Sequence, residues 1–258
     1  MTVIVVPYHQ DERLPNDLIP LPSGRDHLVV DTALPDGDVW RRLVALDDAV
    51  ANQVAAAVGT GRTTTVISGD CLVGVATLAG VQRAGVDPAL IWFDAHGDMH
   101  TLETTTSGYL GGLSLRLALG AHADLLAPLR LRPVDEGRAV LVGARDLDPP
   151  EVDYLAASAV RQSGVAGLDA DGLPGGRLVL HVDVDVVDPA GLPGLLFPAP
   201  GGPAAATVLA AVQRVLDTGR VVALNVACTW HPTFDGRVRQ TRAALIAALI
   251  EMVSVPRP

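Results

Sequence analysis

Two short segments carry alternating acidic and histidine side chains that suit a metal site. The first segment is 91–101 and the second is 181–189. The candidate ligands that they supply are Asp94, His96, Asp98, Asp183 and Asp185. Two carboxylates spaced two residues apart on a valine-rich strand are costly to bury unless a cation neutralises them. Four carboxylates and one imidazole form a hard, oxygen-rich set that favours Mn²⁺ or Mg²⁺ over a thiolate-type zinc site.

The spacing within each segment matters because alternate residues of a strand point to one face. If the strands continue through the segments, Asp94 and His96 share one face, and His181, Asp183 and Asp185 share another. Taken singly, an aspartate in this position is more often a solvated strand end or a helix cap. The presence of two such clusters, each after an apolar run, favours the metal site.

Six apolar runs predict the strands that position these clusters. The runs are 3–6, 64–68, 90–93, 139–142, 178–182 and 221–226. Several lack polar alternation, as strands covered on both faces do. Ala- and Leu-rich stretches with helical spacing lie between them, at 40–58, 73–84 and 204–218. This alternation predicts an α/β fold with a mainly parallel sheet covered by helices on both faces.

In such folds, ligands bind at the carboxyl ends of the strands, which is where both clusters lie. The Gly- and Pro-rich stretch 189–203 is predicted to be one long ordered loop and not a domain boundary. Long loops inside α/β domains are often functional. We find no internal repeat and no linker long enough to separate domains, so residues 1–258 are predicted to form a single domain.

Composition narrows the class of protein further. The 258 residues are 49% hydrophobic, and 19 basic against 29 acidic residues give a net charge of −10. The chain has no basic cluster, and only 3% of its residues are aromatic, so a nucleic-acid partner is not expected. No apolar run is long enough to span a membrane. The two cysteines are too few for a disulfide framework, and we expect a cytoplasmic protein.

The motifs resemble those of the ureohydrolases, which include arginase, agmatinase and formiminoglutamase. Asp94-Ala95-His96-Gly97-Asp98 followed by Thr101, and later Asp183-Val184-Asp185 followed by Asp188-Pro189, carry the resemblance. Four further segments occur in the family's order, at 69–71, 104–112, 143–151 and 193–202. Each segment alone is a weak signal, but six in order are a strong one.

The resemblance implies a three-layer α/β/α domain that holds two Mn²⁺ ions. In the family pattern Asp94 and Asp183 would bridge both ions, Asp98 would bind one ion, and His96 and Asp185 would bind the other. The reaction implied is hydrolysis of a C–N bond in a linear guanidine or amidine. Two close cations make hydroxide available near neutral pH, and this strong nucleophile is needed because the guanidinium carbon is a poor electrophile.

Three positions depart from the family pattern. Cys71 stands where the family has its first metal-ligand histidine, so it is either a soft ligand or a buried cysteine without a chemical role. Gly111 replaces a proton-shuttling histidine, and His100 is the nearest acid–base candidate, although contact with the distal end of the substrate is the alternative role. Cys228 or Thr229 replaces a substrate-binding glutamate, depending on the alignment.

Other residues of the substrate loop are also implied by the resemblance. Ser107 and Tyr109 are expected at the mouth of the site with His100, in contact with the polar end of the substrate. Cys71 and Cys228 are both expected near the cavity, close enough to form a disulfide in one of the outcomes considered. A homo-oligomer is expected because oligomers are common in the family.

Three readings of function follow from these departures. The first is a binuclear manganese hydrolase, and the branch that cleaves Nω-hydroxyarginine is the first substrate class to test because that branch also carries a cysteine at the position of Cys71. The second is a catalytically impaired, metal-binding relative with a regulatory or binding role, which the missing glutamate favours. The third is a single-zinc, histone-deacetylase-like enzyme, against which the paired Asp183 and Asp185 argue.

Overall fold

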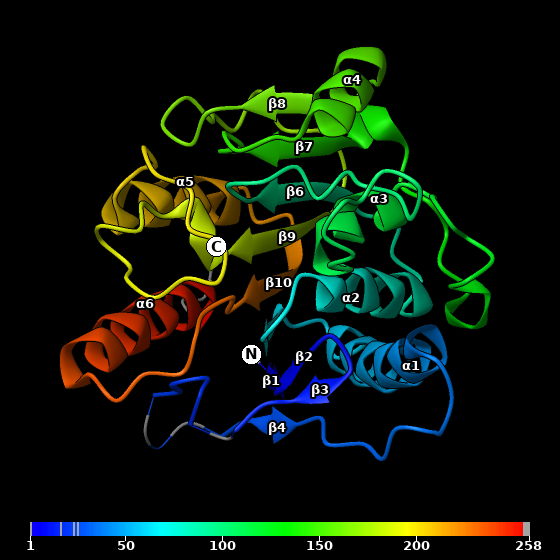
Figure 1. Cartoon of the computed structure of the whole chain (residues 1–258), viewed down its shortest axis with the longest axis horizontal. Helices are drawn as coiled ribbons and strands as arrows, with labels where there is room; N and C mark the ends of the chain where they lie inside the picture. The colour runs from blue at the N-terminus through cyan, green and yellow to red at the C-terminus, as the bar shows by residue number, and fades with distance from the viewer. Residues whose placement is uncertain (1, 16, 23, 25, 255–258) are drawn as a thin grey trace.

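Eight parallel strands form the central sheet of the computed structural model (Figure 1). The structure describes residues 2–15, 17–22, 24 and 26–254. The strand order is β4-β1-β5-β10-β9-β6-β7-β8, and every neighbouring pair is parallel. The strands are β1 (Thr2–Val6), β4 (Leu28–Val29), β5 (Thr64–Ser68), β6 (Ala89–Phe93), β7 (Ala139–Val142), β8 (Arg161–Ser163), β9 (Leu178–Asp183) and β10 (Val221–Ala227). A separate antiparallel pair joins β2 (Tyr8–His9) and β3 (Glu12–Arg13).

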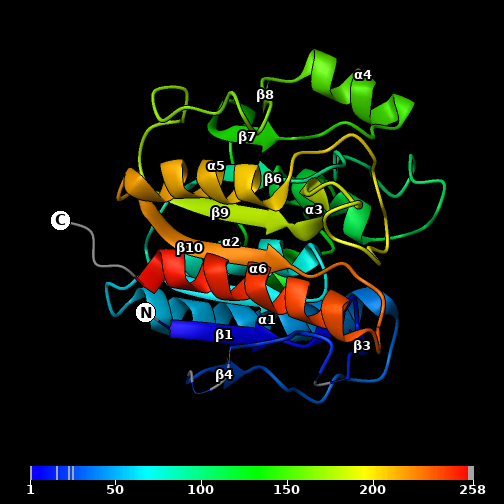
Figure 2. The same ribbon diagram turned by 90° about the vertical axis from the view of Figure 1, so that its left-hand side faces the viewer.

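Helices cover both faces of this sheet, as Figures 1 and 2 show from two sides. One face carries α1 (Val39–Val58), α2 (Leu72–Arg83) and the short α3 (Ser114–Ala118), and the other carries α5 (Ala205–Asp217) and α6 (Gly236–Ser254). The helix α4 (Pro149–Ala157) lies near the β7–β8 edge. The prediction of a three-layer α/β/α fold with a mainly parallel sheet is confirmed. Among the described residues, no helix is both long enough and apolar enough to cross a membrane.

The strands next to the site are buried along their whole length, which explains their apolar sequences. Every residue of β5, β6, β7 and β9 is buried. Successive side chains of a strand alternate between the α1–α2 layer and the α5–α6 layer. In β10, Val226 packs in the core cluster that contains α5 and α6 residues, whereas Ala227 packs in the cluster that contains α1 and α2 residues.

A side-chain cap fixes the start of α1, and a glycine lets α1 and α2 pack closely. The side chain of Asp38 accepts a hydrogen bond of 2.9 Å from the backbone N–H of Arg41 and caps α1. Gly80 lets α2 approach α1 closely, because a Cβ atom there would lie 2.6 Å from the carbonyl oxygen of Ala51. α1 and α2 therefore pack closely against each other.

The strands do not continue through the acidic clusters, so the condition under which alternate side chains of each cluster would share one face is not met. β6 ends at Phe93, and β9 ends at Asp183, after which Val184–Val186 forms a 3₁₀ turn. At each strand end the aspartate accepts a hydrogen bond of 2.8 Å from the backbone N–H two residues later: Asp94 Oδ1 from His96 and Asp183 Oδ1 from Asp185. Because this local bond competes with the ladder, each aspartate turns the chain at the edge of the sheet.

Candidate metal centre

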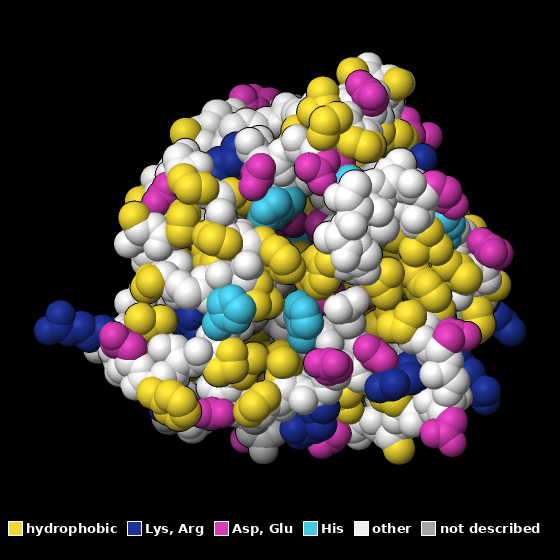
Figure 3. All heavy atoms as spheres, in the orientation of Figure 1, with side chains coloured by type: hydrophobic (Ala, Val, Ile, Leu, Met, Phe, Trp, Pro, Cys, Tyr) yellow, Lys and Arg dark blue, Asp and Glu magenta, His cyan; other side chains and the backbone are white. Residues whose placement is uncertain are grey.

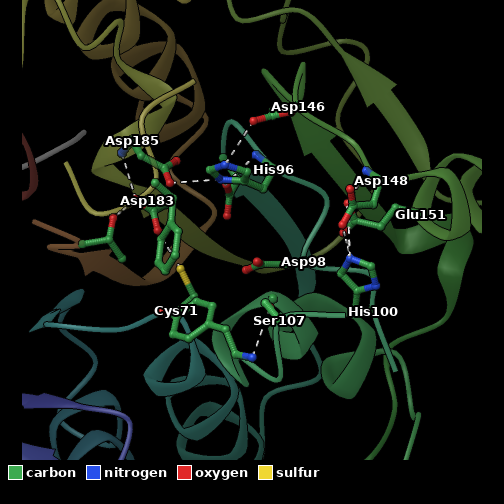
Figure 4. Close-up of a pocket in the computed structure, with 15 residues that line it drawn as sticks. Cys71, His96, Asp98, His100, Ser107, Asp146, Asp148, Glu151, Asp183 and Asp185 are labelled. Carbon is green, nitrogen blue, oxygen red and sulfur yellow. Dashed lines mark hydrogen bonds and ion pairs between the residues drawn. The ribbon is translucent and has the colours of Figure 1, made fainter. Parts of the chain in front are cut away.

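A pocket of about 220 Å³ opens at the carboxyl ends of the central strands. The space-filling view shows a hollow on this face, with histidine and acidic side chains around it (Figure 3). All but one of the predicted site residues line the pocket: Cys71, Asp94, His96, Asp98, His100, Ser107, Tyr109, Asp183, Asp185 and Thr229. The close-up shows that these side chains come from several different strand ends and loops (Figure 4).

Asp183 lies at the centre of one group of contacts. Its Oδ2 atom accepts a hydrogen bond of 2.8 Å from the Cys71 thiol, and its Oδ1 atom accepts one of 2.6 Å from the Thr229 hydroxyl. Cys71 stands at the start of α2, which points its first turn at the site. Since all three residues are at most 3% exposed, this arrangement holds the Asp183 carboxylate in a fixed orientation.

His96 joins the two acidic clusters. Its Nδ1 atom lies 3.4 Å from Asp94 Oδ1 and 3.1 Å from Asp185 Oδ2. These three residues offer ligand atoms that all lie within 4.8 Å of one another, close enough to share one metal ion. The two carboxylates hold the pKa of His96 up at about 12 although burial lowers it, so in the absence of a cation the imidazole supplies the positive charge.

Asp98 and Asp183 have too little positive charge near them to balance the charge of two buried carboxylates. Asp98 and Asp183 are buried, and burial followed by repulsion from the neighbouring aspartates raises the pKa of each well above its usual range. The Oδ2 atom of Asp98 is buried without a hydrogen-bond partner. A divalent cation would neutralise these clustered like charges and give the unpartnered carboxylate oxygen a partner, so the residues fit a metal centre.

The predicted substrate loop forms the mouth of the pocket. The Tyr109 hydroxyl donates a hydrogen bond of 3.0 Å to Asp70 Oδ2, and its ring packs 4.6 Å from that of Phe197. His100 Nε2 lies 3.0 Å from Asp148 Oδ2 on the opposite side of the opening. Ser107 lines the pocket and accepts the backbone N–H of Tyr109.

Cys228 is the predicted residue that does not line the pocket. It follows β10, and the alternation of that segment places its side chain in the core cluster on the α5–α6 side, whereas Cys71 belongs to the cluster on the α1–α2 side. Both cysteines are free, so the structure has no disulfide between them. Thr229, one residue later, turns back toward the site and occupies the position beside Asp183.

The pocket also contains residues that we did not predict individually. These are Gly112, Asp146, Asp148, Glu151 and Phe197. Three of them belong to the 143–151 segment and one to the 193–202 segment, so the family motifs pointed to these regions but not to the residues. Glu151 is buried and accepts the backbone N–H of Met99 at 3.0 Å, which ties α4 to the first acidic cluster.

Arg145 holds the second cluster in place from behind. Its guanidinium donates to the carbonyl oxygens of Asp185, Val186 and Ala199 at 2.7–3.1 Å. These contacts fasten the turn that follows Asp183 to the long 189–203 loop. Arg145 is therefore a positioning residue for Asp185, a role that the sequence left undefined.

Comparison with known proteins places this architecture among the ureohydrolases. The sequence profile of the arginase family matches residues 29–254. An N(omega)-hydroxy-L-arginine amidinohydrolase from Streptomyces lavendulae is 32% identical over 195 residues, covering 74% of this chain and 68% of that protein. An arginase from Eremothecium gossypii is 31% identical over 196 residues, covering 69% of this chain, and the match spans 49% of that arginase.

The fold agrees with a solved structure of the same family. The crystal structure of arginase from Bacillus subtilis superposes with a TM-score of 0.81, at 23% identity, over 100% of this chain and 98% of the other. The family match covers most of the chain and includes both acidic clusters. On this evidence the chain belongs to the arginase family.

Proposed function

We propose that this chain is a binuclear manganese hydrolase that cleaves a C–N bond of a linear guanidine or amidine. The observation that carries the proposal is the convergence of Asp94, His96, Asp98, Asp183 and Asp185 in one pocket, after two different strands of the sheet. Four of these side chains are buried carboxylates, which favour a hard divalent cation.

The residues divide between two metal positions according to the family pattern. Cys71 and Asp98 would hold one ion, His96 and Asp185 the other, and Asp94 and Asp183 both. When bound, two Mn²⁺ ions make hydroxide available near neutral pH for attack on the guanidine carbon. Thr229 and Cys71 each donate a hydrogen bond to Asp183, so they orient this carboxylate.

His100 is the candidate acid for the leaving nitrogen. Its imidazole lines the pocket, and its Nε2 atom lies 3.0 Å from Asp148 Oδ2, which orients the ring. Gly111 has no acid–base group, and among the described residues that line the pocket His100 is the histidine that is not proposed as a metal ligand. Tyr109 and Ser107, at the mouth, would contact the polar end of the substrate.

We further propose that the substrate is an N-hydroxyguanidine such as Nω-hydroxyarginine. Thr229 is neutral and stands beside Asp183, where the family resemblance puts a carboxylate that binds guanidinium. An N-hydroxyguanidine has a lower pKa than a guanidine, so its neutral form needs no such partner. The similarity to the N(omega)-hydroxy-L-arginine amidinohydrolase of Streptomyces lavendulae supports the same substrate class.

The test combines metal analysis with product assays. The protein is loaded with Mn²⁺ and incubated with arginine, agmatine, formiminoglutamate and Nω-hydroxyarginine, and urea, formamide and hydroxyurea are measured. We expect two Mn²⁺ per chain and hydroxyurea release that exceeds urea release from arginine. Equal loss of activity in Asp98→Asn and Asp185→Asn, with the exposed Asp153→Asn as the control, would show that both metal positions are needed.

A catalytically impaired, metal-binding relative is the second candidate function. The absence of a side chain at Gly111 and of a carboxylate at Thr229 favours it. A chain that binds two Mn²⁺ but turns over none of the four compounds would support this reading and contradict hydrolysis. The predictions of a single domain, a homo-oligomer and a cytoplasmic location are part of the proposal for either function.

A further inference from the structure

The buried His181 lies on β9, two residues before Asp183, and has no part in the function proposed so far. Its side chain is fully buried and does not line the pocket. Its ring stacks on that of Trp92, with centroids 3.5 Å apart and an interplanar angle of 12°. A Cβ atom on Gly74 of α2 would lie 2.9 Å from His181 Nδ1, so only glycine leaves space for the imidazole.

The hydrogen bonds of this imidazole leave one nitrogen available. Nδ1 lies 2.6 Å from Asn225 Oδ1 on the neighbouring strand β10. Because Asn225 Oδ1 accepts a hydrogen bond, the proton of the neutral imidazole is on Nδ1. The Nε2 atom is then unprotonated, and its lone pair is available to a metal ion. Nε2 is buried and has no hydrogen-bond partner. Histidines that bind metals usually donate their other N–H to such an acceptor, which sets both tautomer and ring orientation.

The neighbours of His181 complete a set of possible metal ligands. A ring nitrogen of His181, the Cys71 sulfur and an Asp94 carboxylate oxygen all lie within 4.8 Å of one another, and all three residues are buried. Donors that share one tetrahedral Zn²⁺ at about 2.0–2.3 Å lie roughly 3.3–3.8 Å apart, so side-chain movements of about 1 Å would bring the three onto one ion. Asp183 Oδ2, 2.8 Å from the sulfur, is available as a fourth donor.

We propose that His181 is a metal ligand, and that Cys71, Asp94, Asp183 and His181 form a sulfur–nitrogen–oxygen site that selects Zn²⁺ over Mn²⁺. The inference rests on the proposed metal centre and changes the donor set and identity of one of its two ions. Thiolate and imidazole are softer donors than carboxylate and suit Zn²⁺, whereas the His96–Asp185 position keeps its oxygen-rich set. The imidazole that position 71 lacks is thus supplied from the strand below.

Cobalt gives a direct readout of the proposed ligands without any assay of hydrolysis. Chelator-treated protein is titrated with Co²⁺, and we expect a near-ultraviolet sulfur-to-cobalt charge-transfer band together with visible bands of tetrahedral intensity. The charge-transfer band should disappear in Cys71→Ser and persist in Asp185→Asn. Binding of Co²⁺ without the charge-transfer band in the wild-type protein would overturn the proposal.

The contribution of His181 is tested with a variant that keeps its shape. His181→Phe retains a ring against Trp92 but has no nitrogen, and we expect the affinity for Zn²⁺ to fall at least 10-fold. Asn225→Leu removes the acceptor for Nδ1 and should lower the affinity of the protein for Zn²⁺ by about 10- to 100-fold. The remote His122→Gln is the control for loss of an imidazole and should bind Zn²⁺ normally. Unchanged Zn²⁺ affinity in folded His181→Phe would overturn the assignment.

X-ray absorption at the zinc edge decides the question in the unaltered protein if His181→Phe does not fold. One sulfur neighbour and imidazole scattering around the first bound Zn²⁺ support the proposal, and a shell of oxygen alone overturns it. Hydrolysis is measured separately with Mn²⁺-loaded protein. Turnover without the sulfur band would contradict only the zinc site, whereas the sulfur band without turnover of any guanidine would contradict only the proposed hydrolase activity.

Discussion

The Tyr109 ring occupies the space into which a side chain at position 111 would extend. A Cβ atom on Gly111 would lie 2.4 Å from both Cζ and the hydroxyl oxygen of Tyr109. The ring is held there by the hydrogen bond to Asp70 and by contacts with His9 and Phe197. The glycine at 111 and the tyrosine at 109 are therefore two parts of one arrangement of the pocket wall.

This relationship predicts strong coupling between the two positions. Gly111→Ala should destabilise the protein by about 1–3 kcal/mol, because the Tyr109 ring must leave its place. In the Tyr109→Ala background the same substitution should cost much less. Urea unfolding of the four proteins of this double-mutant cycle measures the coupling, and additive effects would contradict the packing argument.

The Thr229 hydroxyl should contribute to metal affinity through Asp183. Thr229→Val keeps the shape of the side chain but removes the 2.6 Å hydrogen bond, so the carboxylate loses a donor that orients its charged form. We expect a 10- to 100-fold weaker Mn²⁺ affinity, as for other residues that position a ligand. Thr229→Ser keeps the hydroxyl and should bind Mn²⁺ within a few-fold of the wild-type protein. Isothermal titration calorimetry measures both, and equal affinities of the two variants would argue against this role.

Manganese should stabilise the wild-type protein but not Asp183→Asn. At a Mn²⁺ concentration about 100-fold above Kd the native state gains about 2.7 kcal/mol. For a chain of this size that is an increase in Tm of about 5–10 °C. In Asp183→Asn we expect no increase, while the metal-free Tm should change little or rise because one buried negative charge is removed. The exposed Asp153→Asn should respond to Mn²⁺ like the wild-type protein.

The pH dependence of the metal-free protein should depend on Asp185. Burial, and then the charge of Asp94, raise the pKa of Asp185 from 3.8 to about 6. A raised carboxyl pKa stabilises the folded state fully at pH values below about 4, and this stabilisation is lost as the pH rises through 6. His181 contributes in the opposite direction, since burial lowers its pKa to about 4, so comparison with a variant is needed.

The free energy of unfolding of chelator-treated wild-type protein is compared with that of Asp185→Asn. The His181 contribution is common to both, whereas the variant also loses the contact by which Asp185 raises the pKa of His96, which adds a loss of the same sign to the wild-type protein. Between pH 5 and pH 7 the wild-type protein should lose about 1 kcal/mol relative to the variant. Saturating Mn²⁺ should remove this loss, since it displaces the proton. A difference between the two proteins that does not change with pH would show that Asp185 does not titrate in this range.

Much of the fold could be predicted from the sequence because the strands are buried on both faces. The runs at 64–68 and 139–142 coincide with β5 and β7, and 40–58 with α1 to within one residue. The hairpin β2–β3, the edge strands β4 and β8, and the helices α4 and α6 were not predicted. Three of the four strands have only two residues, and β8 has three, so none is long enough for a periodic pattern.

The sequence predicted the kinds of residue in the site, but not which of two neighbouring residues faces it. The sequence determined that carboxylates and histidine follow two buried strands, and hence which residue types meet at the sheet edge. It could not decide between Cys228 and Thr229, because a shift of one residue moves a side chain to the opposite layer. In the structure, the backbone N–H of Cys228 donates a hydrogen bond to the carbonyl oxygen of Ser68 in β5, and the Cys228 side chain packs in the core. The Thr229 side chain faces the pocket.

The position of His181 is a second feature that the sequence predicted only in part. Its spacing from Asp183 placed it on the side of the acidic cluster, and the sequence could say nothing about depth or partners. Only the alignment of β6, β9 and β10 puts Trp92 and Asn225 on either side of it, and only the packing of α2 puts Gly74 and Cys71 above it. Contacts between residues far apart in sequence depend on strand register and helix packing, which no local pattern encodes.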